Sequence, residues 1–150
     1  MKIFKLIYNF IFKTKRRGLT VKAVFLAALA RFRIYFYPGS KLHRYLGEIG
    51  KETDKNAIED INKQHDIYFI ADKVARVANR VPWESKCLVQ AMVAQRLLRG
   101  YGLSSTLYLG VGRDNRTGGK MIAHAWVRCG TYYVCGGNGE NYGTVASFIY

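Results

Sequence analysis

The sequence predicts an α+β protein, in which a helical N-terminal half packs on a small antiparallel sheet. Apolar residues recur at intervals of three and four up to residue 99, and beyond Gly102 they alternate with other residues. Glycines and short polar segments separate the alternating runs, which is typical of hairpins. The chain has 150 residues, and we expect one domain over 1–150.

Proline residues set the ends of two expected helices. Pro38 follows a helix over 21–36, and Pro82 follows another over 67–81, because the residue before a proline avoids the helical region. The clearest helical pattern covers 85–99. The remaining expected elements are a short helix over 41–47 and strands over 105–112, 121–128, 132–135 and 144–150, the strands forming an antiparallel meander.

Positive charge is concentrated in the first third of the chain. The formal net charge is +14, and residues 1–50 hold 11 Lys and Arg but only one acid, Glu48. Such asymmetry suggests a polyanion, an anionic membrane surface or an acidic peptide as partner. Residues 1–17 are a basic extension whose start is amphipathic on a helix. We expect it to dock partner proteins, with peripheral membrane contact as an alternative.

Composition excludes several classes of protein. A hydrophobic content of 49% and an aromatic content of 14% are too high for a disordered chain. The apolar runs 6–12 and 23–30 are shorter than the roughly 20 residues that a spanning helix needs. Three cysteines without a CxxC pair argue against a disulfide scaffold and a structural zinc site. We expect no metal and no cofactor, and a cytoplasmic location.

Two segments carry candidate chemistry. Cys87 falls in the first turn of the helix over 85–99, where unpaired backbone amides and the helix dipole favour a thiolate. His124 lies on a strand between two alanines and shares a face with Trp126, so its imidazole has room to take a proton from a thiol. We expect Cys87 and His124 to meet at the floor of one groove. The alternative is a buried cysteine and a structural histidine.

Together these segments resemble a known family, the transglutaminase-like cysteine protease of lasso peptide biosynthesis. The resemblance covers residues from about 20 to 150 and rests on the order and spacing of Trp83, Cys87-Leu88, Gln90-Ala91, Leu109-Gly110-Val111 and Ala123-His124-Ala125-Trp126-Val127. It implies a transglutaminase/papain-like core and the role of a discrete leader peptidase. Cys87 would attack the peptide bond between leader and core of a ribosomally made precursor, and His124 would act as the base.

The resemblance also implies partners and further site residues. The partners are the leader segment of the precursor peptide, a small leader-recognition protein and an ATP-dependent macrocyclase; no nucleic acid is expected. In this family an Asp about a dozen residues after the histidine orients the imidazole, but residues 129–150 contain no Asp. Asn138 is the first candidate for that role, before Glu140 and Asn141. Candidate oxyanion or cleft residues are the Cys87 backbone amide, Trp83, Gln90 and Trp126.

Other hypotheses stay open. The chain could be a catalytically degenerate member that only binds peptide, a transglutaminase proper, or a basic module that binds nucleic acid or an anionic surface. A metal site would need Cys87, Cys129, Cys135 and His124, whose spacing is poor for zinc. A two-residue turn at Cys129-Gly130 would place Cys135 opposite His124 on the neighbouring strand.

Overall fold

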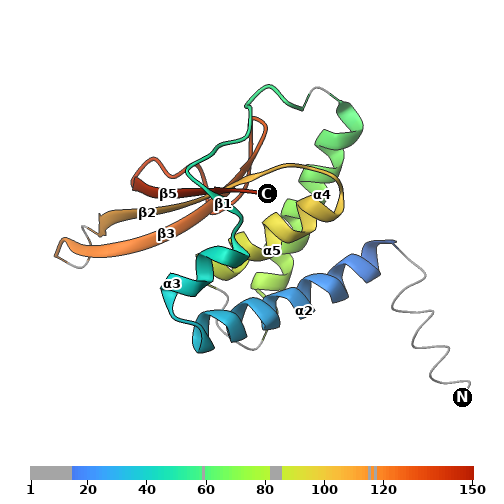
Figure 1. The fold of residues 1–150 in the computed structure, drawn as a ribbon. Helices are drawn as coiled ribbons and strands as arrows, with labels where there is room; N and C mark the ends of the chain where they lie inside the picture. The colour runs from blue at the N-terminus through green and yellow to red at the C-terminus, as the bar shows by residue number, and fades with distance from the viewer. Residues whose placement is uncertain (1–14, 59, 82–85, 115, 117) are drawn as a thin grey trace, which may run out of the picture.

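The computed structural model describes residues 15–58, 60–81, 86–114, 116 and 118–150. Trp83 and residues 1–14 of the expected basic extension therefore lie outside the described residues. The elements are α2 (Lys15–Phe36), α3 (Gly39–Leu42), the 3-10 turn η1 (His43–Tyr45), β1 (Glu48–Ile49), α4 (Ile61–Ala78), α5 (Cys87–Gly100), β2 (Thr106–Asp114), β3 (Lys120–Cys129), β4 (Tyr132–Cys135) and β5 (Gly143–Ile149). Helices α2, α4 and α5 gather beside one antiparallel sheet (Figure 1), so the predicted α+β class is confirmed.

The sheet has the strand order β1-β5-β2-β3-β4. The predicted meander holds from β2 to β4 and is wrong for β5, which pairs with β2 instead of following β4. Residues 136–142 must therefore pass across the sheet from the β4 edge to β5. Strand β1 was not predicted, because its two residues are too short to show a period.

Helix α5 occupies the centre of the molecule and fixes the position of Cys87. It packs on α2, on α4 and on the sheet, as Figure 1 shows. Leu97 and Leu98 are fully buried, and they belong to the same hydrophobic core as Ile70 of α4 and Val127 of β3. A helix buried along most of its length holds its first residue rigidly, because little of its surface can move without opening the core.

Two helices begin earlier than predicted. Helix α2 starts at Lys15, since buried Leu19 continues its apolar face toward the N-terminus. Helix α4 starts at Ile61, because the Asp60 carboxylate accepts a hydrogen bond from the Asn62 amide at 2.8 Å and caps the first turn. Of the helices described, none combines the length and hydropathy required to cross a bilayer.

Candidate active site

Cys87 is the first residue of α5, in agreement with its predicted place in the first turn of a helix over 85–99. The first helical hydrogen bond runs from the Gln90 amide to the Lys86 carbonyl oxygen at 3.1 Å. The amides of the preceding turn, including that of Cys87, therefore have no acceptor within the helix, and the positive end of the helix dipole lies at the half-buried thiol. Such a position suits both a thiolate and an oxyanion.

The other two cysteines are poor nucleophiles. Burial raises the pKa of the Cys129 thiol to about 11, and the thiol donates a hydrogen bond to the Ser104 carbonyl oxygen at 3.3 Å. Burial likewise raises the pKa of Cys135 to about 12. Both thiols stay protonated at neutral pH, and the thiolate is the reactive form. Among the residues that the structure describes, no three His, Cys, Asp or Glu side chains are placed to share a metal ion.

The imidazole of His124 is held in one orientation. Its Nε2 lies 2.7 Å from the carbonyl oxygen of Gly136. A carbonyl oxygen can only accept, so Nε2 carries the proton and Nδ1 keeps its lone pair. The ring stacks on Tyr142 at a centroid distance of 4.5 Å and lies nearly parallel to Trp126 at 6.0 Å. The stacked rings and the hydrogen bond restrict rotation of the imidazole and leave Nδ1 as its proton acceptor.

Gly136 makes the orienting contact that the sequence assigned to Asn138. The two residues lie in the same segment, but the Asn138 side-chain oxygen accepts from the Glu140 amide at 3.3 Å. Gly136 has a φ of +77°, and a Cβ there would lie 2.3 Å from the Ala125 carbonyl oxygen. Only glycine fits so close to β3 in this conformation. The prediction for Asn138 is therefore corrected: the backbone of Gly136, twelve residues after the histidine, takes the place of a side chain.

Cys135 is the last residue of β4, the strand that pairs with the strand of His124. The prediction that it would face His124 is wrong, because it pairs with Val127. The turn lies one residue later than assumed, after Cys129 pairs with Tyr132, and a register shift follows it. Burial is the main cause of the raised pKa of Cys135, and a charge on Cys87 adds to it, which indicates that the two thiols lie in the same region of the molecule. Helix α5 packs on β4, and the Gly136 oxygen that contacts His124 follows β4 directly. The meeting of Cys87 and His124 in one groove stays a prediction.

Trp126 is a buried support rather than an open cleft wall. Its side chain is 4% exposed and stacks on Tyr108 at 5.4 Å. A Cβ on Gly110 would lie 2.7 Å from the indole ring, and one on Gly139 would lie 2.5 Å from it. The two glycines thus allow the strand and the crossing segment to close over the ring. Gln90, one turn beyond Cys87, is half-buried, and its role in oxyanion binding stays a prediction.

Two contributors to the site were missed by sequence reasoning. The Gly136 carbonyl has no side-chain signature, although a Gly136-Gly137 pair twelve residues after a candidate histidine was a signal for a close backbone approach. Tyr142 stacks on His124 only because residues 136–142 cross the sheet, a path that periodicity does not reveal.

Comparison with known protein families assigns most of the chain to one superfamily. A sequence model of the Transglutaminase-like superfamily matches residues 27–147, a range that includes Cys87, His124 and Gly136. No curated protein and no solved structure matches the chain significantly. The matched range starts within α2 and ends within β5, so it covers the central helix and almost the whole sheet. The chain belongs to the transglutaminase-like superfamily.

Proposed function

We propose that the protein is a cysteine peptidase that removes the leader from a ribosomally made precursor of the lasso type. The observation that carries this proposal is the hydrogen bond from His124 Nε2 to the Gly136 oxygen, which leaves Nδ1 as the proton acceptor. Cys87 begins the buried helix α5, which packs on β4 and on β3, the strand of His124. The proposal brings this thiol and this imidazole together as the pair that peptide-bond cleavage by a cysteine enzyme requires.

The proposed reaction uses these groups in two stages. The Cys87 thiol gives its proton to His124 Nδ1, and the sulfur attacks the carbonyl carbon at the leader–core junction. The Cys87 amide, which has no acceptor within α5, stabilises the oxyanion of the tetrahedral intermediate. When the C–N bond breaks, the imidazolium gives its proton to the leaving amine. His124 then takes a proton from water, which attacks the thioester and releases the acid, and the thiol is restored.

Among the described residues, a carbonyl oxygen and not a carboxylate bonds to the imidazole. A carbonyl oxygen orients the imidazole and fixes its tautomer, but it stabilises the imidazolium less than a carboxylate would because it carries no full charge. We therefore expect turnover slower than that of an enzyme with a Cys-His-Asp triad. The degenerate, peptide-binding alternative is favoured by the same observation, and it predicts binding of the leader without cleavage.

The substrate class and the partners follow from the family resemblance. A small recognition protein would deliver the precursor by its leader, and an ATP-dependent macrocyclase would close the ring of the released core. These assignments deepen the proposed peptidase activity and depend on it.

Cleavage of a precursor by the purified chain tests the proposal. The precursor and the recognition protein are incubated with wild type, Cys87→Ala or Cys129→Ala, and products are identified by mass spectrometry. Cys129→Ala is the matched control, because it removes a thiol held protonated by burial. We expect a single cut with wild type and with Cys129→Ala, and none with Cys87→Ala. Equal cleavage by all three proteins would refute the assignment of Cys87 as the nucleophile. Binding of the leader without any cleavage would support the alternative of a catalytically degenerate, peptide-binding protein.

A further inference from the structure

Helix α2 is apolar on two opposite sides. Its inner side packs in the core through Leu19, Ala23, Ala27 and Ala30. Its outer side carries a second apolar row, the outer stripe, which consists of Val21, Val24, Phe25, Ala28, Phe32, Tyr35 and Phe36. These residues repeat at intervals of three and four, so they form one row about 22 Å long at 1.5 Å per residue. A helix that is apolar on both sides is normally covered on both.

The outer stripe is open in this structure. The exposed fractions are 66% for Phe25, 53% for Phe32, 78% for Tyr35 and 61% for Phe36. The aromatic rings at the end of the helix pack on one another, with centroid distances of 4.4 Å for Phe32–Phe36 and 5.0 Å for Tyr35–Phe36. A contiguous exposed aromatic surface of this kind marks an interaction site, whereas single exposed apolar residues do not.

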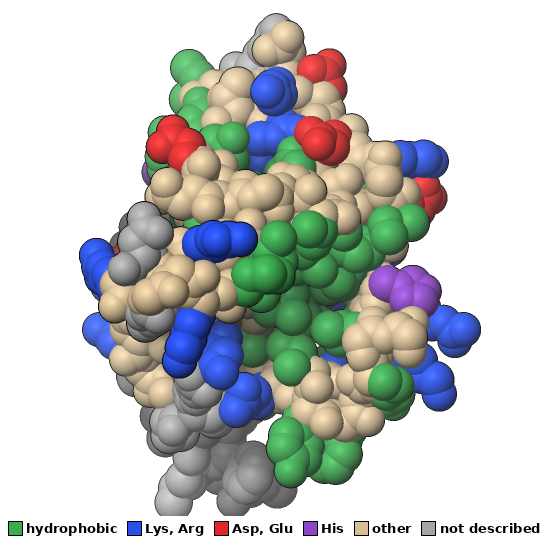
Figure 2. Space-filling view, turned by 90° about the vertical axis from the view of Figure 1, so that its left-hand side faces the viewer, with side chains coloured by type: hydrophobic (Ala, Val, Ile, Leu, Met, Phe, Trp, Pro, Cys, Tyr) green, Lys and Arg blue, Asp and Glu red, His purple; other side chains and the backbone are tan. Residues whose placement is uncertain are grey.

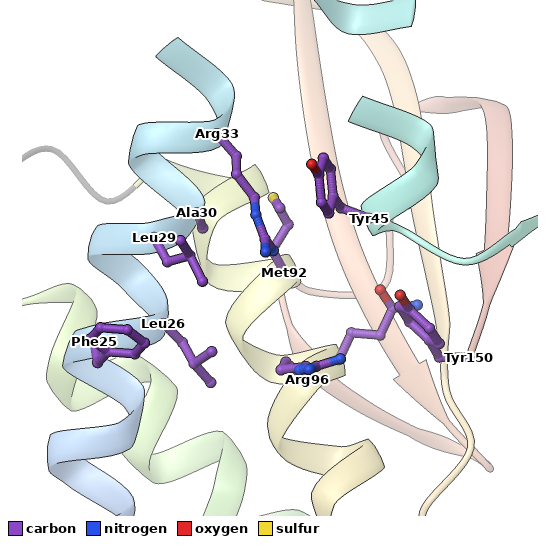
Figure 3. A pocket seen from close by; sticks show the side chains of 10 residues that line it. Phe25, Leu26, Leu29, Ala30, Arg33, Tyr45, Met92, Arg96 and Tyr150 are labelled. Atoms are coloured by element: carbon purple, nitrogen blue, oxygen red, sulfur yellow. The ribbon is translucent and has the colours of Figure 1, made fainter. Parts of the chain in front are cut away.

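Basic residues border the stripe on the side of α5. The sequence of α2 contains no Asp or Glu. A cavity of about 240 Å³ lies between α2 and α5, and its lining includes Phe25 and Arg33 of α2 and Arg96 of α5 (Figure 3). Lys22 lies beside Arg96 and Arg99 in an adjoining hollow. None of the described residues that line these two hollows is acidic.

The opposite border of the stripe faces α4 and is also basic. There Val24 lines a hollow of about 420 Å³ together with Lys73, Arg76 and Arg80. Arg76 is paired with Asp72 at 2.7 Å, so part of this charge is already compensated. Figure 2 has the same vertical direction as Figure 1. The lower part of the face that it shows, at the height of α2, carries hydrophobic and basic side chains, and the acidic side chains visible in Figure 2 lie above this part.

We propose that the outer stripe of α2 docks on an anionic lipid surface. Aromatic side chains on one row of a helix, with Lys and Arg on both borders and no acid between them, are the pattern of a helix that lies in the plane of a membrane interface. The rings enter the boundary between head groups and acyl chains, and the basic side chains contact lipid phosphates. Helix α2 lies at the lower border of the helical layer (Figure 1), where its outer side can approach an extended surface.

Co-sedimentation with vesicles tests this docking. The full chain is mixed with vesicles of phosphatidylcholine alone or of phosphatidylcholine with phosphatidylglycerol, at low and high salt. The first variant combines Phe25→Gln with Phe32→Gln, and the second combines Lys22→Gln with Arg96→Gln. Met121→Gln is the matched control, because Met121 is 74% exposed at the start of β3, away from α2. Circular dichroism establishes that each variant folds.

We expect binding to the anionic vesicles only, and weaker binding at high salt. The Phe variant should bind at least about tenfold more weakly, because two buried rings are lost. The Lys and Arg variant should lose about fivefold per charge at low salt. Met121→Gln should bind like wild type. Absent binding, equal binding to both vesicle types, or an unchanged affinity of the Phe variant would overturn the proposal. The proposal would also be overturned if the Phe variant lost self-association but kept its affinity for lipid, because the outer stripe would then be covered by a second copy of the protein.

Discussion

The start of α5 and the segment 136–142 supply the two halves of the candidate site by different means. At α5 a side chain matters: Cys87 stands at the end of a buried helix, and its position follows from helical periodicity. In the crossing segment the backbone matters: the Gly136 oxygen orients His124, and glycines let the chain pass close to β3 and Trp126. We call the start of α5 the side-chain half of the site and the segment 136–142 its backbone half. The side-chain half depends on the identity of one side chain, whereas the backbone half is disturbed by a Cβ added where the chain passes close to β3.

The largest effect is expected in the side-chain half. Cys87→Ala should lower the rate of precursor cleavage at least about a thousandfold, because no other group can form the acyl-enzyme. The thermal unfolding midpoint should change little, because the thiol is only half-buried and the substitution removes a single atom. Mass-spectrometric rate measurement and calorimetry on the same preparation separate the two effects. A variant that cleaves within tenfold of wild type would place the nucleophile elsewhere.

The backbone half is tested by two adjacent glycines. Gly136 and Gly137 have φ values of +77° and +69°, so alanine strains both positions by about 1 kcal/mol. Only at Gly136 does the new Cβ also meet the backbone of β3, which adds about 1–3 kcal/mol and displaces the oxygen bonded to His124. We expect Gly136→Ala to lose most of its activity and more stability than Gly137→Ala, which should keep its activity. Equal losses of activity in both variants would show that the clash is irrelevant.

Asn138→Ala sharpens the same comparison. The Asn138 side chain accepts a hydrogen bond from the Glu140 amide, and no hydrogen bond from Asn138 to the imidazole is described. We therefore expect the rate of cleavage to stay within about threefold of wild type. The free energy of unfolding should fall by about 0.5–1 kcal/mol, because one hydrogen bond is lost. The ratio of kcat/KM values measures this. A hundredfold loss without loss of stability would return the orienting role to Asn138.

The effect with the least bearing on activity concerns stability at alkaline pH. Burial holds the pKa of Cys129 near 11 and that of Cys135 near 12, above the ordinary thiol value of 9.0. Above about pH 9 the unfolded chain releases these protons first, so the free energy of unfolding falls as pH rises. Cys135→Ala should show a shallower fall between pH 8 and 11 in urea titrations. Val134→Ala, which removes buried volume from the same strand, should lower stability and keep the wild-type slope.

Sequence reasoning succeeded where side chains alone carry the signal. Strand β4 has the predicted bounds, and Cys87 stands at the predicted end of a helix, because alternation and apolar period depend on local residues. It failed for the β4 register and for the return of β5 to β2, since a one-residue shift and a crossing leave the pattern of apolar residues unchanged. The orienting group was misassigned for a related reason: a carbonyl oxygen is present at every residue, and only the fold selects Gly136.

The central claim is that Cys87 and His124 share a proton, and alkylation of Cys87 tests it most directly. The rate at which iodoacetamide labels Cys87 at pH 6.5 is measured by peptide mass spectrometry in wild type and in His124→Ala. We predict at least a tenfold slower reaction without the imidazole, with Cys129 and Cys135 unlabelled in both folded proteins. The same labelling rate in the two proteins would contradict the account.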